Sequence, residues 1–154
     1  MSVLYPMHVG ICVRDLELSV RFYRDGLGFE EAGRLEVSDE ATATLLEIPG
    51  AELQAVYLER DGLRIELLHY PKPGAVGTPE PRPMNQVGLT HLAVRVTNLD
   101  DTLAKLAPLG AVILEQTRVR NDVYDAHIIY ITDPDGTRIE CVQVAKDPTR
   151  TEAP

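Results

Sequence analysis

The chain has 154 residues, enough for one ordinary domain or two very small fused units. Apolar residues make up 44% of it, which excludes global disorder, and the net charge of −9 argues against nucleic acid or an anionic membrane as partner. No signal-like or membrane-spanning apolar stretch is visible, and two cysteines are too few for a disulfide framework. We therefore expect a soluble cytoplasmic protein with buried, reduced thiols.

The first half of the chain predicts a strand, a helix and three more strands. The opening strand is expected over residues 8–13, and Asp15 then offers a side-chain oxygen as a helix N-cap. The apolar residues that follow recur at helical spacing, namely Leu16, Val20 and Tyr23. Further strands are expected at 43–48, 53–59 and 63–70, with an Asp-Gly hairpin turn at 61–62.

The second half predicts the same order of elements. Residues 71–86 hold five of the eleven prolines and are expected to form an extended linker. A strand over 91–96 follows, and Asn98 is the expected cap of a second helix. Strands are expected at 112–117, 127–132 and 137–144, with a turn at 133–136 joining the last two.

Two matching segments indicate an internal duplication. The sequence Asp-Gly-Leu-Arg-Ile-Glu at 61–66 recurs as Asp-Gly-Thr-Arg-Ile-Glu at 135–140, and the opening strands of the two halves also resemble one another. We predict an α+β fold with a mostly antiparallel sheet in each half. The expected organisation is a first module at 1–70, the linker at 71–86, a second module at 87–146 and a flexible tail at 147–154.

A histidine begins each module and a glutamate lies in its last strand. Strand alternation places His8 and His91 on the face away from the apolar side chains of their strands, beside the small residues Gly10 and Ala93. We interpret these small residues as leaving room for a cavity. Glu66 and its counterpart Glu140 lie between apolar neighbours, which is costly for a carboxylate unless it is paired or metal-bound.

Two imidazoles and two carboxylates related by duplication can converge on one ion. This set suits Zn, Ni, Co, Mn or Fe, and four protein ligands leave two octahedral positions free for substrate oxygens. A single His or Glu in a strand is more often structural or solvated, so the hypothesis depends on the repeated quartet. His127 is a further candidate for the cavity, whereas His69 is expected on the face opposite Glu66. The polar residues at 118–124 predict either an anion-holding flap or a solvated loop.

The sequence resembles the vicinal oxygen chelate superfamily over residues 5–145. Its first half carries His-x-x-x-x-Val-x-Asp-Leu and then Phe-Tyr-x-Asp-x-Leu-Gly-Phe at 8–29, and its second carries Thr-Asp-Pro-Asp-Gly and then Ile-Glu at 132–140. The resemblance implies two tandem βαβββ modules that form a cupped mixed sheet around a metal site. Glyoxalase I is similar in using His, Glu, His and Glu, an order that this chain offers as His8, Glu66, His91 and Glu140.

Other members fit less closely. Methylmalonyl-CoA epimerase is similar in its long linker but typically has Gln in place of Glu66, and its separate catalytic Glu has only Glu47 as a near match here. Extradiol dioxygenases use a second His in place of Glu66, and drug-binding members usually lack the quartet.

The resemblance therefore implies an isomerase, epimerase or lyase that abstracts a proton next to a carbonyl through a metal-stabilised enediolate, with Glu140 or Glu66 as base. Expected substrates are thioesters, hemithioacetals, keto-sugars or keto-cyclitols, and a homodimer is expected. The alternatives are an Fe(II) extradiol-type dioxygenase and a metal-free binding protein.

Overall fold

The computed structural model describes residues 2–147. The chain divides into two compact units, Met1–Thr78 and Pro79–Pro154, hereafter the first and second units, and each is described by itself. The expected tail lies outside the described residues apart from Asp147. None of the helices within residues 2–147 is long and apolar enough to cross a membrane.

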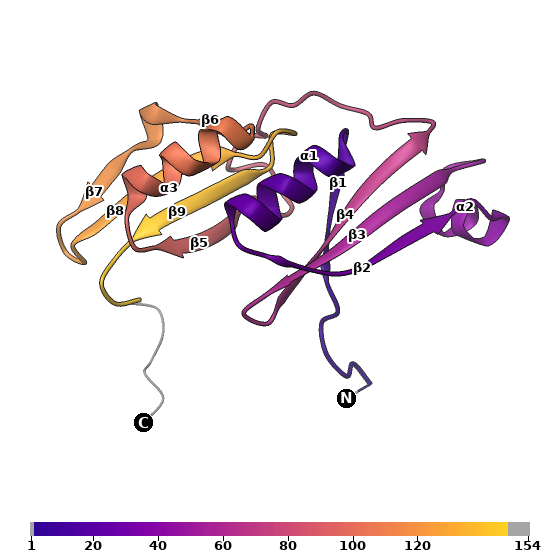
Figure 1. The fold of residues 1–154 in the computed structure, drawn as a ribbon, viewed down its shortest axis with the longest axis horizontal. Coiled ribbons are helices and arrows are strands. Elements are labelled where there is room, and N and C mark those ends of the chain that lie inside the picture. Colours follow the sequence, from indigo (N-terminus) through magenta and orange to yellow (C-terminus); the bar gives the residue numbers. More distant parts are fainter. Residues whose placement is uncertain (1, 148–154) are drawn as a thin grey trace. The chain divides into compact units, whose positions relative to one another are not determined.

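The first unit is a four-stranded mixed sheet with one helix across it (Figure 1). The strand order is β1-β4-β3-β2, in which β1 and β4 are parallel and the other pairs antiparallel. Its elements are β1 (Val9–Val13), α1 (Leu16–Arg21) with a π-helical turn (Phe22–Gly26), β2 (Glu30–Val37), α2 (Glu40–Leu46), β3 (Glu52–Arg60) and β4 (Leu63–Lys72).

The second unit repeats this plan. Its strand order is β5-β9-β8-β6, with β5 parallel to β9 and with β7 also paired to β8. Its elements are β5 (Leu92–Val96), α3 (Leu99–Leu106) with a 3-10 turn (Ala107–Leu109), β6 (Val112–Ile113), a 3-10 turn (Glu115–Thr117), β7 (Val119–Asn121), β8 (Ala126–Thr132) and β9 (Arg138–Gln143). The predicted α+β class and its paired βαβββ order are confirmed.

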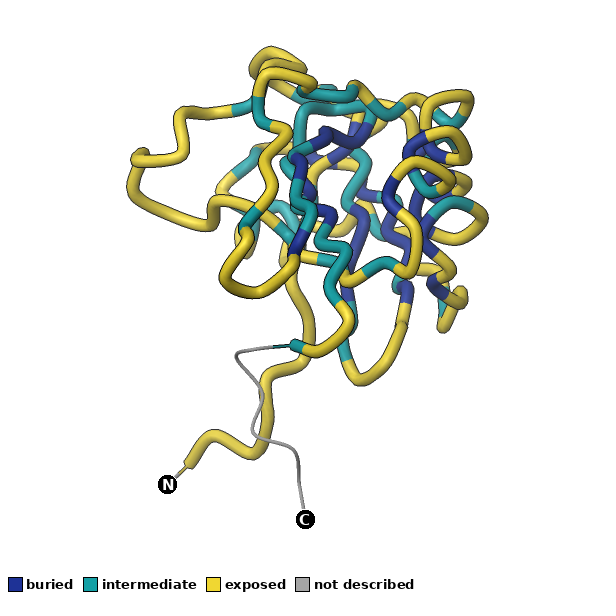
Figure 2. Tube along the Cα trace, turned by 90° about the vertical axis from the view of Figure 1, so that its left-hand side faces the viewer, coloured by how far each residue is buried: buried dark blue, intermediate teal, exposed yellow. Residues whose placement is uncertain are grey.

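The two predicted helices, α1 and α3, begin at the predicted caps. The side chain of Asp15 accepts a hydrogen bond from the backbone N–H of Leu18, and that of Asn98 accepts one from Asp101. Each helix then buries one apolar stripe against its sheet, as Val20 in α1 and Leu103 in α3 illustrate. Figure 2 shows buried residues in the strands and helices and exposed ones in the connections and the N-terminal segment.

The two β-hairpins before the closing strands turn differently. Asp61 and Gly62 both have positive φ, 50° and 83°, as a tight hairpin turn requires. The turn before β9 is longer, and its Asp133 is fully buried. One oxygen of Asp133 accepts hydrogen bonds from the backbone N–H groups of Asp135 and Thr137 at 2.9 and 2.8 Å. This carboxylate therefore organises the turn from inside.

Several predicted strands were wrong. Residues 43–48 belong largely to α2, because Asp39 caps a helix by accepting from the Thr42 N–H, and Glu47 ends it in the left-handed conformation. The sequence reading missed β2, a charged strand that pairs only with β3 within its sheet, as edge strands commonly do. It also missed β7 and extended β6 too far, since Glu115–Thr117 turn as a 3-10 helix.

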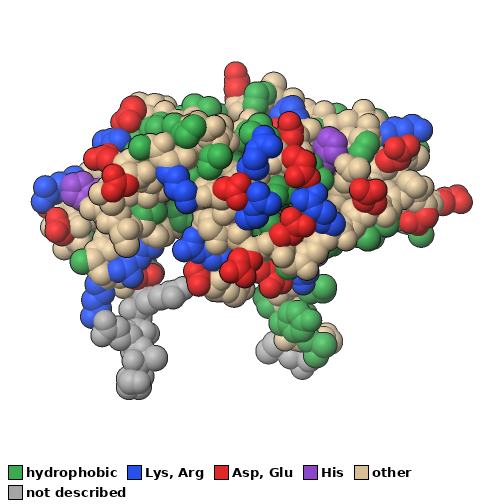
Figure 3. Space-filling model, viewed as in Figure 1, with side chains coloured by type: hydrophobic (Ala, Val, Ile, Leu, Met, Phe, Trp, Pro, Cys, Tyr) green, Lys and Arg blue, Asp and Glu red, His purple; other side chains and the backbone are tan. Residues whose placement is uncertain are grey.

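Charge is distributed as interspersed acidic and basic groups on the face shown in Figure 3. Arg34 illustrates the pattern, because it forms ion pairs with Glu31 and Glu17 at 2.7 and 2.5 Å. The same two carboxylates raise the pKa of Arg34 above its ordinary value. The charge of Arg34 is therefore offset by two carboxylates.

Candidate metal and catalytic site

The first unit brings His8 and Glu66 together. Glu66 lies in the middle of β4, opposite Gly10 of β1 and Tyr57 of β3, and only 9% of its surface is exposed. Its neighbours Ile65 and Leu67 point to the other face, where they are fully buried. The Nε2 atom of His8 is 3.0 Å from Oε2 of Glu66. The pair thus occupies the sheet face away from α1.

The second unit repeats the arrangement with His91 and Glu140. Glu140 lies opposite Ala93 of β5 and Tyr130 of β8, and its Oε2 atom is 3.3 Å from Nε2 of His91. The other ring nitrogen, Nδ1, is 2.9 Å from the hydroxyl of Thr90. If Nδ1 donates this hydrogen bond, Nε2 carries the free lone pair that a metal ligand needs.

Each His–Glu pair fits a divalent metal ion by its donor chemistry and by the distance between its nitrogen and oxygen atoms. Two ligands at about 2.1 Å from an ion and at right angles to one another are about 3.0 Å apart. The observed separations of 3.0 and 3.3 Å match this, and the longer one exceeds most N–H···O hydrogen bonds. In residues 2–147 these side chains form two His–Glu pairs, and the same residues contain no cluster of three or more His, Cys, Asp or Glu.

A tyrosine and an arginine accompany each pair, and the sequence reading missed all four. The ring of Tyr57 meets that of His8 edge-on at 5.7 Å, and the ring of Tyr130 meets that of His91 at 5.5 Å. The guanidinium groups of Arg64 and Arg138 lie over these tyrosines, at 4.7 and 5.8 Å from the ring centres. The arginines could have been found, because each precedes its glutamate by two residues in the repeated hexamer and so shares its face.

The two tyrosines differ in how they interact with the neighbouring carboxylate. The pKa of Tyr57 is raised above its ordinary value mainly because its side chain is hydrogen-bonded to Glu66, with burial as the next cause. The pKa of Tyr130 is raised mainly by burial and only then by the charge of Glu140. Each arginine opposes the shift of its own tyrosine.

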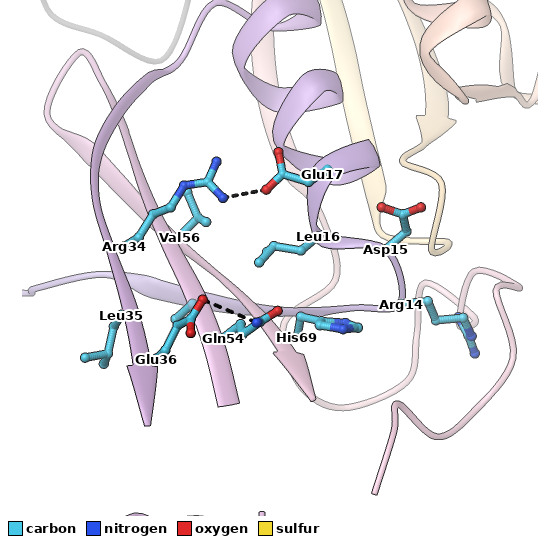
Figure 4. A pocket seen from close by; sticks show the side chains of 11 residues that line it. Arg14, Asp15, Leu16, Glu17, Arg34, Leu35, Glu36, Gln54, Val56 and His69 are labelled. Atoms are coloured by element: carbon cyan, nitrogen blue, oxygen red, sulfur yellow. Dashed lines mark hydrogen bonds and ion pairs between the residues drawn. The ribbon is translucent and has the colours of Figure 1, made fainter. Parts of the chain in front are cut away.

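The other two histidines lie on the opposite faces of their sheets. His69 follows the buried-face residues of β4, its Nδ1 is 3.3 Å from the carbonyl oxygen of Val13, and it lines a surface pocket of about 390 Å³ with Arg34 and Glu17 (Figure 4). His127 and Tyr130 are three residues apart in β8, so their side chains point to opposite faces of the sheet. His127 shares its face with Ile129. His127, the further candidate for the cavity, therefore lies on the sheet face opposite Glu140, and it does not join the His91–Glu140 pair.

Three other interpretations change in the structure. Arg118 forms an ion pair with Glu115, and Arg120 forms one with Asp122, so these arginines already have carboxylate partners, which favours the solvated loop over the anion-holding flap. Cys12 is exposed and not buried as expected. Leu68 occupies much of the space that was expected beside Gly10, because a Cβ atom added to Gly10 would lie 3.1 Å from Cδ1 of Leu68.

Comparison with known proteins identifies the family. Residues 6–141 match the Glyoxalase/Bleomycin resistance protein/Dioxygenase superfamily, and the chain belongs to it. The chain is 29% identical over 145 residues to catechol-2,3-dioxygenase of Bacillus subtilis (strain 168), in a match that covers 90% of the chain and 42% of that relative. It therefore spans less than half the length of this relative.

Solved structures share the fold. A glyoxalase family protein from Bacillus cereus superposes with a TM-score of 0.80 at 19% identity, covering 95% of this chain and 97% of that one. The trypanothione-dependent glyoxalase I of Leishmania major superposes with a TM-score of 0.58 at 21% identity, covering 88% and 84%. Members of the superfamily include glyoxalases and dioxygenases, act on small molecules and typically bind a divalent metal ion.

Proposed function

We propose that the protein is a metal-dependent isomerase, epimerase or lyase that moves a proton on the carbon next to a carbonyl group. His8, Glu66, His91 and Glu140 are the proposed ligands of one divalent ion, of the group Zn, Ni, Co, Mn and Fe. The observation that supports this most is the repetition of one His–Glu pair, with each histidine directly before the first strand of its unit and each glutamate in the closing strand, and with N···O distances of 3.0 and 3.3 Å. A structural role for one His–Glu pair would not explain why the other unit has an equivalent pair.

The proposed chemistry divides between the ion and the carboxylates. The ion, when bound, polarises the carbonyl oxygen and stabilises negative charge on it. Glu140 accepts the proton from the adjacent carbon and returns it to the other face or to a neighbouring carbon. Its side chain is 24% exposed, whereas that of Glu66 is 11% exposed, so Glu140 has the greater freedom to move toward a substrate. Glu66 remains a ligand.

The test is hydrogen exchange in D₂O with metal-loaded protein. The compounds are a 2-oxo thioester-type compound, a hemithioacetal, a keto-sugar and a keto-cyclitol, each followed by NMR. Deuterium next to the carbonyl, without oxygen consumption, is the expected result for at least one class. Protein treated with a chelator is the control, and it should lose the exchange. Metal-independent exchange, or none with any class, would contradict the proposal.

A second candidate is an extradiol-type Fe(II) dioxygenase, favoured by the similarity to catechol-2,3-dioxygenase over 145 residues. In that case His8, His91 and Glu140 form a two-histidine, one-carboxylate iron site and Glu66 is a bystander. Oxygen uptake with catechols and Fe(II), accompanied by ring-cleaved products, distinguishes this function from proton transfer. Retention of that activity in Glu66→Gln would strengthen it.

The expected homodimer and the alternative of metal-free ligand binding are settled by two simple measurements. Light scattering coupled to size-exclusion chromatography should give twice the chain mass of 17.0 kDa. Metal analysis of freshly purified protein should give about one ion per chain. A protein free of metal that also fails to take up any of the five ions would be a binding protein.

A further inference from the structure

One arginine extends the sheet face of the second unit that carries the His–Glu pair. Exposed and partly buried residues alternate in β5, and Arg95 is exposed on the same side as Ala93. Ala93 lies opposite Glu140 across the sheet, whereas Arg95 lies opposite the next residue of β9 on that face, Val142. The adjacent Gln143 points the other way, because its side chain accepts a hydrogen bond from the first backbone N–H of α3 at 2.7 Å. Arg95 therefore shares its face with the candidate ligands.

The guanidinium group of Arg95 is held by backbone oxygens. Its Nε atom donates a hydrogen bond to the carbonyl oxygen of Val144 at 3.0 Å, and its Nη2 atom donates one to that of Ala145. These two bonds use one edge of the planar group and fix its orientation. The edge between Nη1 and Nη2 keeps two donors directed away from these carbonyl oxygens. Two parallel donors on a fixed plane suit the paired oxygens of a carboxylate or a phosphate group.

The charge of Arg95 is also unusual for this acidic chain. Other exposed arginines form ion pairs with carboxylates, as Arg34, Arg118 and Arg120 do. Among residues 2–147, the hydrogen-bond partners of Arg95 are the two backbone oxygens, and it forms no ion pair with a carboxylate there. Its positive charge is therefore available to an anion that the chain does not supply.

The first unit shows that the repeated fold does not require an arginine at this position. Cys12 of β1 is the equivalent residue, because it lies opposite Leu68, two residues beyond Glu66 in β4. It is exposed, as Arg95 is. The arginine is thus a feature of the second unit alone, and pairing of the strands does not explain it.

We propose that Arg95 binds a remote carboxylate or phosphate group of the substrate, so that the substrate is an anionic carbonyl compound. This inference rests on the proposed function, in which the carbonyl group lies at the ion. Residues advance about 3.3 Å each along a strand, so the Cα atoms of His91 and Arg95 are about 13 Å apart. A substrate that reaches both has its anionic group on the order of 10 Å from its carbonyl. Thioesters and hemithioacetals can carry such a group, whereas an unsubstituted keto-sugar or keto-cyclitol has none.

Linear hydroxamates test this contact without turnover. Each is added to Zn²⁺-loaded protein, where its two hydroxamate oxygens can occupy free positions on the ion, and its affinity is measured by calorimetry. The compounds form a series of increasing chain length, and each length ends in a carboxylate, a phosphonate or a neutral carboxamide. At one length we expect an anionic end to bind about tenfold more tightly than the carboxamide, as a charge-assisted hydrogen bond typically provides. The tighter of the two anions identifies the group, and equal affinities at every length would overturn the inference.

Three variants assign this preference to Arg95. Arg95→Gln should lower the ratio of anionic to neutral affinity to below about threefold, while affinity for the carboxamide compound is kept. Arg95→Lys retains the charge without the fixed pair of donors, so its ratio should be intermediate. Arg120→Gln is the matched control, because it removes a positive charge from the same unit but on the face of His127, and it should leave the ratio unchanged. A purely structural role of Arg95 would weaken binding of all compounds equally, and an unchanged ratio in Arg95→Gln would overturn the inference.

The two proposals fail differently. If the native protein binds no divalent ion, the hydroxamates have no ion to bind and the proposed function is wrong. If it binds the ion and the carboxamide compound but gains nothing from an anionic end, only the inference about Arg95 is wrong. If the anionic preference depends on Arg95 but no carbonyl compound exchanges deuterium, the anion-binding role stands and the proposed reaction is wrong.

Discussion

The two units have the same order of elements but differ in how exposed their glutamates are and in the distance from each glutamate to its histidine. In the first, Nε2 of His8 is 3.0 Å from Oε2 of Glu66, and the Glu66 side chain is 11% exposed. In the second, Glu140 is 3.3 Å from His91 and its side chain is 24% exposed. A duplication can therefore keep the same residue types at equivalent positions while their exposure to solvent differs. Under the proposed function, the more exposed Glu140 is the base and the less exposed Glu66 is a ligand.

The units also differ at the connection that precedes the third strand of each repeat. The first unit inserts α2 between β2 and β3, whereas the second has β7 and a 3-10 turn before β8. These insertions leave the register between the closing strand and its two neighbours unchanged, since Gly10 and Ala93 occupy equivalent positions opposite the two glutamates. The closing strands that carry the two glutamates therefore keep equivalent neighbours in both units.

The largest effect is expected from removing either histidine. His8→Ala and His91→Ala should each weaken binding of a divalent ion by more than about 100-fold, because losing a ligand costs more than losing an outer-shell partner. Metal content after gel filtration and affinity by chelator competition measure this. The His69→Ala variant is the matched control, since His69 lies on the opposite sheet face. If either ligand variant keeps full occupancy, the two pairs do not serve one ion.

The glutamates should separate binding from catalysis. Glu140→Gln keeps a neutral oxygen ligand but removes the base, so deuterium exchange should fall by about 10²- to 10⁴-fold while metal is largely retained. Glu66→Gln should lower metal affinity and affect exchange less once metal is saturating. Exchange rates at saturating metal, read by NMR, test the difference. Equal losses of exchange in both variants would show that the asymmetry of their surroundings has no catalytic consequence.

The smallest predicted effect concerns the two thiols, which lie in different surroundings. Cys12 of β1 is exposed, whereas Cys141 of β9 is fully buried, and burial raises the pKa of the Cys141 thiol to about 11. At pH 8 a water-soluble disulfide reagent should label one thiol per native chain and two after denaturation. Cys12→Ser should abolish the native labelling, and Cys141→Ser should leave it unchanged. Rapid labelling of two thiols in the native protein would mean that β9 opens readily.

Local sequence patterns determined much of the fold. The caps at Asp15 and Asn98, the helical spacing of apolar residues and the Asp-Gly turn at 61–62 act over a few neighbouring residues, so one chain segment contains all the information needed. The duplicated hexamer also identified both glutamates, because repetition is visible in the sequence. The apolar content of residues 43–48 misled the strand assignment, since the cap of α2 at Asp39 lies upstream of the apolar run.

Only the tertiary structure decided which side chains from separate strands meet. Tyr57 lies opposite Glu66, and the ring of Tyr130 contacts that of His91, because strand register places residues of different segments opposite one another. The same register puts His127 on the face opposite Glu140. The sequence determined that each unit has a histidine and a glutamate with the chemistry of metal ligands. The difference in exposure between the two glutamates arises from burial, which is established only when the strands pair.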